Sequence, residues 1–241
     1  VWYAKLDEDP TSEICLDDKG NAYFVSGLNT LHSLSSKRGP RWEYKNDDPN
    51  VVFTSTPSLS VNGDILIGDS TGKLLFIDED GNLKRTFELG ANSNYPAVSA
   101  LDGSIYVSSG KLFKLTPEGK EIWNFALDNH SVLGYMALDE KGHVYTRLKN
   151  TNFSGEGINR FSARNGDRTI LWGTNKSPIL TGNSRLFFMK DEYVFGLDPS
   201  KTGAELVLWN ARVGRNSVPD GIWMEAPVVS TAGTVYAMAD G

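Results

Sequence analysis

The chain repeats one sequence pattern about every 40 residues, and most copies of the pattern end close to a tryptophan. In the copy that lacks a tryptophan, Arg85 stands at the equivalent position. A period of this length is typical of proteins in which one small structural unit is copied and each copy packs against its neighbours. The tryptophans that mark the repeat are Trp2, Trp42, Trp123, Trp172 and Trp209.

The best-preserved copy, residues 95–127, shows what one unit contains. Apolar segments at residues 95–99, 104–109, 111–115 and 121–127 are separated by short polar turns. Two of these turns hold Asp102-Gly103 and Glu118-Gly119. Such pairs between apolar segments indicate hairpins, because glycine readily adopts the positive φ that a tight turn requires. Each unit is therefore predicted to form four short antiparallel strands, and no helical period is present in the chain.

Four-stranded units repeated at this spacing are typical of the blades of an all-β protein, the β-propeller. Residues 1–6 resemble a fourth strand without its first three, while the chain ends after two strands of a last unit. We therefore predict one domain over residues 1–241 with six blades, in which the N-terminal strand completes the last blade. The alternative is a fragment of a longer protein with more blades. The predicted blades are residues 12–45, 54–89, 94–127, 133–173, 177–211, and 224–241 together with 1–6.

Composition excludes some partners. The net charge is −6, and the 24 lysines and arginines are scattered along the chain, so no basic stripe is available for nucleic acid. No apolar run approaches the roughly 20 residues that span a bilayer, so no membrane-spanning segment is expected. Cys15 is the single cysteine, which excludes an intramolecular disulfide. We expect it to be a buried structural thiol.

The repeats resemble the pyrroloquinoline-quinone (PQQ)-type repeat over nearly the whole chain. In residues 95–127 the resemblance rests on Pro-Ala-Val-Ser, on Asp-Gly before Ile-Tyr-Val, on Lys-Leu-x-x-Leu and on Gly-x-x-x-Trp. The family implies either a quinoprotein dehydrogenase with PQQ and calcium, or a non-catalytic propeller similar to the lipoprotein of the bacterial outer-membrane β-barrel assembly machinery. The dehydrogenases are longer, and many carry an adjacent cysteine pair that this chain lacks. We therefore expect the non-catalytic branch, without a cofactor or metal.

Blade topology also predicts a functional face. The loop between the second and third strands lies on the same face as the link to the next blade. Loops on a rigid scaffold commonly carry binding residues. This face is predicted to hold residues 46–52, 68–72, 90–95, 128–135, 147–157 and 212–225. Its aromatic, charged and amide side chains fit a sugar ring or a peptide, and the alternative is that they only fill the channel. The candidate ligand-binding residues are Asn94, Tyr95, Tyr135, Arg147, Trp223 and Glu225.

The sequence holds no catalytic motif such as Gly-x-Ser-x-Gly or His-Glu-x-x-His. His130 is interpreted as a solvated loop residue. Residues 17–21 and 78–82 are interpreted as turns that join the third and fourth strands of a unit, because a calcium site needs about six to eight oxygen ligands. The predicted function is a binding or assembly scaffold for a protein or an oligosaccharide, located in a bacterial cell envelope, at the cell surface, in the periplasm or outside the cell. The alternatives are a carbohydrate-binding or carbohydrate-active propeller and a calcium-dependent quinoprotein.

Overall fold

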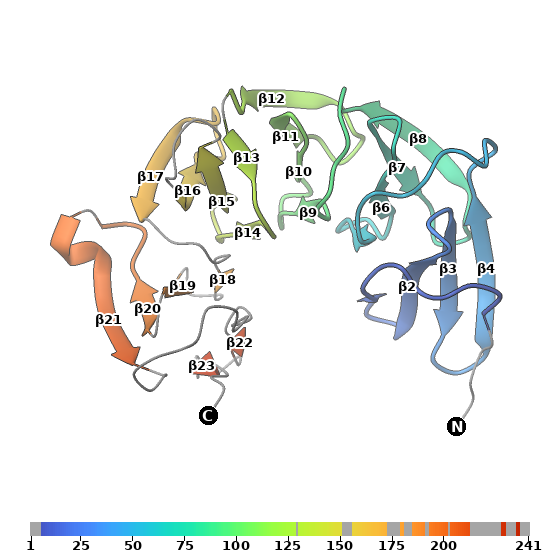
Figure 1. The fold of residues 1–241 in the computed structure, drawn as a ribbon, viewed down its shortest axis with the longest axis horizontal. Coiled ribbons are helices and arrows are strands. Elements are labelled where there is room, and N and C mark those ends of the chain that lie inside the picture. Colours follow the sequence, from blue (N-terminus) through green and yellow to red (C-terminus); the bar gives the residue numbers. More distant parts are fainter. Residues whose placement is uncertain are drawn as a thin grey trace. The chain divides into compact units, whose positions relative to one another are not determined.

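The computed structural model describes residues 6–128, 130–150, 156–172, 179–180, 185–190, 193–201, 203–212, 228–229 and 235–236. The chain divides into two compact units, Val1–Asp128 and Asn129–Gly241. In the described ranges every element is a β-strand except one 3-10 turn, Gly203–Leu206 (Figure 1). No helix long and apolar enough to cross a membrane occurs among these residues.

The first unit contains three four-stranded antiparallel sheets, in each of which the strands follow chain order. We call these sheets blades 1, 2 and 3. Blade 1 consists of β1 (Cys15–Leu16), β2 (Asn21–Ser26), β3 (Thr30–Ser35) and β4 (Gly39–Lys45). Blade 2 consists of β5 (Ser58–Leu59), β6 (Ile65–Gly68), β7 (Lys73–Ile77) and β8 (Leu83–Glu88). Blade 3 consists of β9 (Val98–Ser99), β10 (Ile105–Ser108), β11 (Lys111–Leu115) and β12 (Glu121–Ala126).

The second unit contains two larger sheets and a strand pair. Blade 4 consists of β13 (His130–Val132), β14 (Ala137–Leu138), β15 (Val144–Asn150), β16 (Glu156–Phe161) and β17 (Arg168–Trp172). Blade 5 consists of β18 (Ile179–Leu180), β19 (Leu186–Lys190), β20 (Tyr193–Leu197) and β21 (Val207–Arg212). The pair is β22 (Val228–Val229) with β23 (Val235–Tyr236). Blades 1, 2, 3 and 5 confirm the predicted four-stranded antiparallel unit, whereas the sheet of blade 4 has five strands.

Blade 4 departs from the expected pattern where loops were predicted. β13 pairs with the far end of β15, with His130 opposite Asn150. The hairpin of β15 and β16 therefore extends into the predicted loop 147–157. Burial explains the extension, because Val132 and Leu148 face each other across the added strand and are only 9% and 2% exposed. The interpretation of His130 as a solvated loop residue is wrong, since it lies half-buried in a strand.

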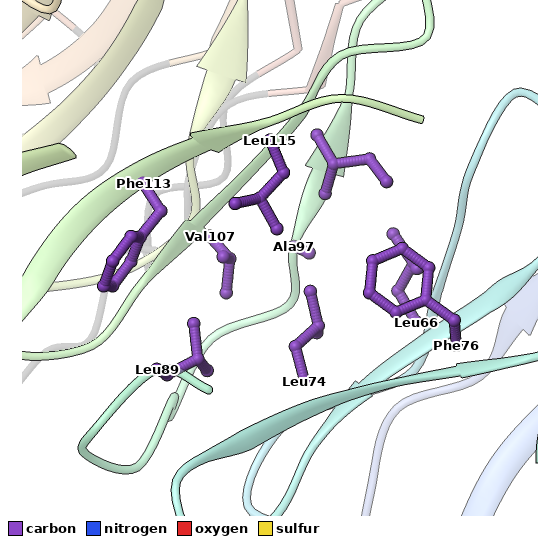
Figure 2. Close-up of a cluster of buried hydrophobic side chains, with 9 residues drawn as sticks. Leu66, Leu74, Phe76, Leu89, Ala97, Val107, Phe113 and Leu115 are labelled. Atoms are coloured by element: carbon purple, nitrogen blue, oxygen red, sulfur yellow. The ribbon is translucent and has the colours of Figure 1, made fainter. Parts of the chain in front are cut away.

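The core of the first unit lies between neighbouring blades. All residues of β6 and β10 are buried, whereas the outer strands β8 and β12 alternate exposed and half-buried residues. A strand covered on both faces needs an apolar run instead of an alternation. Figure 2 shows the cluster between blades 2 and 3, which comprises Leu66, Leu74, Phe76, Leu89, Ala97, Ile105, Val107, Phe113 and Leu115.

Each outer strand carries a bulge that fixes the position of the repeat tryptophan. In blade 1, Ser33 pairs with Trp42 and the register then shifts at the next residue. In blade 2, Phe76 pairs with Arg85 before the same shift. The backbone thus places Arg85 where blade 1 has Trp42, in agreement with the sequence repeat.

One of the two turn interpretations is confirmed and the other is wrong. Residues 78–82 join β7 to β8, the third and fourth strands of blade 2, whereas residues 17–21 join β1 to β2, the first two strands of blade 1. An aspartate side chain that accepts a hydrogen bond from the backbone N–H two residues later is compatible with a turn in either of these hairpins. Cys15 is half-buried instead of fully buried, because β1 is the edge strand of its sheet. Burial and the charge of Asp17 raise the pKa of its thiol. Residues 1–5 and most of the predicted last blade lie outside the described residues, so six blades and a single domain stay predictions.

Candidate functional site

Four of the six predicted binding residues lie in the described chain, in two different units. Asn94 is exposed and Tyr95 is half-buried, both before β9 in the first unit. Tyr135 is 43% exposed and belongs to the second unit. Arg147, in the same unit, lies in strand β15 and not in a loop, with its Nε 3.7 Å from Oε2 of Glu156.

Trp223 and Glu225 lie outside the described residues. Because the other four residues divide between the two units, the prediction that the six belong to one ligand-binding face stays a prediction. Its test requires a ligand bound to the protein.

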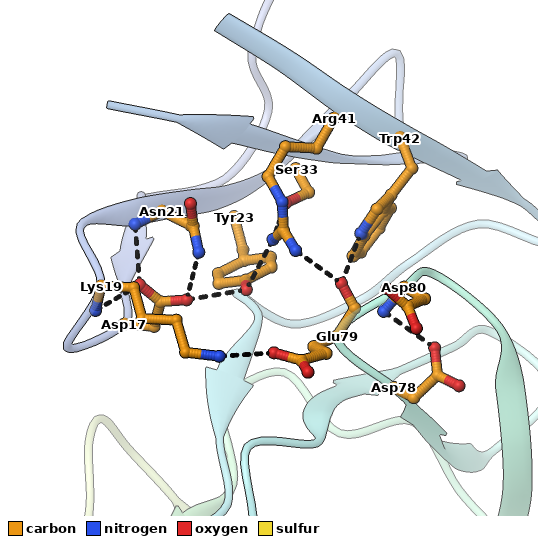
Figure 3. A network of polar contacts seen from close by, with 10 residues as sticks. All are labelled: Asp17, Lys19, Asn21, Tyr23, Ser33, Arg41, Trp42, Asp78, Glu79 and Asp80. Atoms are coloured by element: carbon orange, nitrogen blue, oxygen red, sulfur yellow. Dashed lines mark hydrogen bonds and ion pairs between the residues drawn. The ribbon is translucent and has the colours of Figure 1, made fainter. Parts of the chain in front are cut away.

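The structure instead draws attention to the junctions between blades. At the junction of blades 1 and 2, Trp42 packs on the ring of Tyr23 with 5.9 Å between ring centroids. Trp42 Nε1 donates a hydrogen bond of 2.8 Å to the backbone oxygen of Glu79, in the turn between β7 and β8. Arg41 Nη2 donates to the same oxygen over 3.0 Å (Figure 3). The outer strand of one blade therefore holds a turn of the next blade.

A hydrogen-bond chain continues from this contact into blade 1. Arg41 Nη1 donates to the hydroxyl of Tyr23 over 3.2 Å, and that hydroxyl donates to Asp17 Oδ2 over 3.0 Å (Figure 3). Asp17 Oδ1 accepts the backbone N–H of Asn21 over 2.7 Å. Burial alone would raise the pKa of Asp17, but the hydrogen bonds from Asn21 and Tyr23 outweigh it and lower that pKa.

A carboxylate from blade 2 completes the same junction. Glu79 Oε2 lies 2.6 Å from Nζ of Lys19, in the turn between β1 and β2 (Figure 3). This hydrogen bond, followed by the charge of Lys19, lowers the pKa of Glu79. Glu79 thus contributes both its backbone oxygen and its side chain to blade 1.

The junction of blades 2 and 3 uses different chemistry for the same contact. Arg85 Nη2 donates to the backbone oxygen of Pro117 over 2.7 Å and to Asp64 Oδ2 over 3.0 Å. Its guanidinium lies 4.2 Å from the ring centroid of Phe76, where a cation is attracted by the ring. Pro117 stands in the turn between β11 and β12, so an arginine replaces the tryptophan as the donor to the next blade.

The junction of blades 4 and 5 repeats the arrangement of blades 1 and 2. Asp139 Oδ1 accepts the backbone N–H groups of Lys141 and His143 over 3.0 and 2.8 Å. Asp139 Oδ2 accepts the hydroxyl of Tyr145 over 3.0 Å, and burial followed by the charge of Asp139 raises the pKa of Tyr145. Asp139, Lys141 and Tyr145 therefore correspond to Asp17, Lys19 and Tyr23.

The receiving turn of blade 5 holds a proline where blade 2 holds Glu79. Arg160 Nη1 donates to the backbone oxygen of Pro199 over 3.1 Å. Arg160 comes from β16, whereas Arg41 comes from β4, yet both reach the equivalent carbonyl. Because a proline side chain has no charge, it cannot pair with Lys141 as Glu79 pairs with Lys19.

A cavity of about 280 Å³ lies at this junction of blades 4 and 5. Arg185 pairs with Asp198 on one side of it. A hydrogen bond from Ser200, ahead of the bond from Arg185, lowers the pKa of Asp198. His143 Nδ1 accepts the backbone N–H of Ala163 over 3.0 Å, which leaves the proton of the neutral ring on Nε2. The charged and titratable side chains that line the cavity among the described residues are Lys141, His143, Tyr145, Arg160, Arg185, Asp139 and Asp198.

Reasoning from the sequence missed this cavity, although a signal was present. The motif Asp-x-Lys-Gly-x-x-Tyr occurs at residues 17–23 and again at residues 139–145. The two turns that receive these motifs both begin with aspartate, and the second position is Glu79 in one and Pro199 in the other. Recognising the difference required knowing that this position faces the lysine of the preceding blade.

A second polar cluster lies on blade 1. Ser26 Oγ is 2.7 Å from His32 Nε2, and His32 Nδ1 is 3.3 Å from Glu43 Oε1. β-sheet register places all three on one face, since His32 pairs with both Phe24 and Glu43 and stacks on the Phe24 ring. A serine, a histidine and a carboxylate in this order form the geometry by which a base activates a serine nucleophile.

The surroundings of this cluster oppose acyl transfer. Asp7, Glu8 and Glu43 line the adjacent cavity with Lys45 as the cation, and carboxylates disfavour the oxyanion that such a reaction develops. Ser26 is only 3% exposed. Burial, opposed by Glu43, lowers the pKa of His32. We interpret the cluster as a hydrogen-bond chain that satisfies buried polar groups.

Comparison with known proteins bears on the fold. No family model matches the chain, and no curated protein shows significant sequence similarity to it. Among solved structures, BamB from Moraxella catarrhalis is similar with a TM-score of 0.58 and 13% identity, covering 98% of this chain and 82% of its own. A catalytically inactive virginiamycin B lyase from Staphylococcus aureus with quinupristin has a TM-score of 0.69 and 14% identity, covering 96% and 84%.

A mitotic checkpoint complex contains a further similar chain, with a TM-score of 0.63, 13% identity and coverage of 88% and 75%. These similarities confirm the β-propeller as the fold class. They also confirm, at the level of the fold, the resemblance to PQQ-like propellers. Since a fold hosts many functions, the site has to supply the functional argument.

Proposed function

We propose that the chain is a β-propeller scaffold that binds a partner protein in the bacterial cell envelope or as a secreted protein. The observation that carries the proposal is the cavity between blades 4 and 5, which has a volume of about 280 Å³ and is lined by charged side chains. At the equivalent place in the first unit, Glu79 pairs with Lys19.

Two similarities of fold support a scaffold role. One similar structure is BamB, and another is part of a mitotic checkpoint complex, which is an assembly of proteins. The junctions between blades support a scaffold role as well, because the hydrogen bonds between neighbouring blades hold the surrounding surface in one conformation for a partner.

The test is affinity capture by the folded protein from bacterial envelope and culture-medium fractions. We expect one protein to be retained by the wild type and by Lys120→Glu, and to be lost with Lys141→Glu. Lys120 is the matched control because it is an exposed turn lysine outside the cavity. Equal retention by both variants would contradict the proposal.

A thermal-shift assay separates the alternatives, because a ligand that binds only the folded state raises the melting temperature. A saturable rise with PQQ and calcium would support the quinoprotein alternative. A rise with one class of oligosaccharide would support the carbohydrate alternative. The scaffold proposal expects neither.

A further inference from the structure

The junctions between neighbouring blades share one type of contact and can therefore be compared with one another. Three junctions lie within one unit each, and in all three an arginine or tryptophan donates to the second residue of the next blade's turn, at Glu79, Pro117 and Pro199. In the preceding blade, the residue that would meet this position is Lys19, Asn62 or Lys141. Each of these residues directly precedes a turn glycine, and the three glycines donate equivalent backbone hydrogen bonds.

The three combinations differ in one informative way. Lys19 meets Glu79, and the two side chains form an ion pair. Asn62 is the residue that would meet Pro117, and neither of these side chains is charged. Lys141 is the residue that would meet Pro199, so this junction keeps the cation but has no carboxylate at the position of Glu79. Among the described residues Lys141 has no ion pair.

The charges of the cavity are consistent with a missing carboxylate. Among the described residues that line it, Lys141, Arg160 and Arg185 are cations and Asp139 and Asp198 are carboxylates, so the cations exceed the carboxylates by one when His143 is neutral. Asp139 is bound by Tyr145 and by backbone N–H groups, and Asp198 is bound by Arg185 and Ser200. One additional carboxylate would balance the cavity.

We propose that the cavity between blades 4 and 5 binds a carboxylate supplied from outside the chain, in the place that Glu79 occupies at the junction of blades 1 and 2. Lys141 is its ion-pair partner, and Arg160 and the Nε2–H of His143 line the same space. Because Glu79 is the internal template, the ligand is a glutamate side chain of the partner protein. This identification of the source rests on the proposed scaffold function, whereas the carboxylate site itself does not.

The first experiment is an NMR titration of the full chain at constant ionic strength. The probes are glutamate capped by N-acetyl and C-amide groups, the correspondingly capped glutamine, and glutarate. A single exposed ion pair is weak, so we expect saturable shifts with dissociation constants of about 1 mM or above for capped glutamate. We expect no saturable shift for capped glutamine.

Variants locate the site. Lys141→Ala should weaken binding of capped glutamate at least fivefold, while Lys19→Ala, its counterpart in the first unit, should leave binding unchanged. Pro199→Glu should abolish binding by supplying the carboxylate from the chain itself. Glu79→Pro should create a second binding event at Lys19, and proline is compatible with that turn position because Pro117 and Pro199 already occupy it.

The outcomes are distinct. Equal affinity for capped glutamate and capped glutamine, or an unchanged affinity in Lys141→Ala, would overturn the site. Binding of glutarate without binding of capped glutamate would overturn the protein source and indicate a free dicarboxylic acid. Binding at Lys141 together with a failed partner capture would refute the scaffold function while the carboxylate site stands.

Discussion

Replacing Gly81 with alanine tests the packing of Trp42 against the next blade. Gly81 has φ of 90°, and a Cβ added there would lie 2.7 Å from Trp42 Cδ2. Gly63 has φ of 81° in the turn between β5 and β6, but a Cβ there meets no atom within 4 Å. Gly63→Ala therefore measures the backbone term alone.

The magnitude follows from two contributions. An alanine in the left-handed region costs about 1 to 2 kcal/mol at either position. Displacing the indole adds about 1 to 3 kcal/mol of overpacking. We therefore expect Gly81→Ala to reduce the free energy of unfolding by about 2 to 5 kcal/mol, and Gly63→Ala by about 1 to 2 kcal/mol.

Urea unfolding followed by far-ultraviolet circular dichroism measures both values, since this signal does not depend on a tryptophan that is itself replaced. In a Trp42→Ala background the steric contribution disappears, so Gly81→Ala should then cost no more than Gly63→Ala. The coupling between positions 42 and 81 is expected to be about 2 kcal/mol. Equal destabilisation by the two glycine variants in the wild-type background would refute the reasoning.

Three further predictions concern single side chains. Arg85→Lys should lower stability by about 1 to 2 kcal/mol in urea unfolding, because lysine lacks the planar guanidinium that lies over Phe76 while its Nη2 binds Asp64 and the Pro117 carbonyl; an unchanged midpoint would contradict this. The pKa of His32 in the folded protein lies below its usual value of 6.5. Between these two pKa values the unfolded chain binds more protons than the folded chain, so stability falls as the pH decreases from 6.5 toward the folded pKa. His32→Gln should flatten the loss of melting temperature between about pH 6.5 and 5, and an identical slope in both proteins would disprove the assignment. Ser26 should stay unmodified by a fluorophosphonate because carboxylates line its cavity; a mass increase lost in Ser26→Ala would make it a nucleophile.

Local patterns in the sequence determined the strands, the turns and the fold class. Residues 104–109 and 111–115 form a hairpin because their apolar residues and the glycines between strands act within a few residues of one another. The equivalence of Arg85 and Trp42 was also visible in the sequence, since both follow a turn glycine at a similar spacing. The strand β13 escaped prediction because its pairing with β15 depends on burial of Val132 against Leu148.

The tertiary structure alone decided which polar groups meet. Lys19 and Glu79 are 60 residues apart, and only the packing of one blade on the next brings them to 2.6 Å. Arg41 and Arg160 come from different strands yet reach equivalent carbonyls, which no alignment of the repeats would show. Ser26, His32 and Glu43 share a sheet face through register across three strands. The sequence repeat specifies each blade because the hydrogen bonds within a blade are local. The cavity between blades 4 and 5 is formed by side chains from two blades, so only the packing of these blades determines which groups line it.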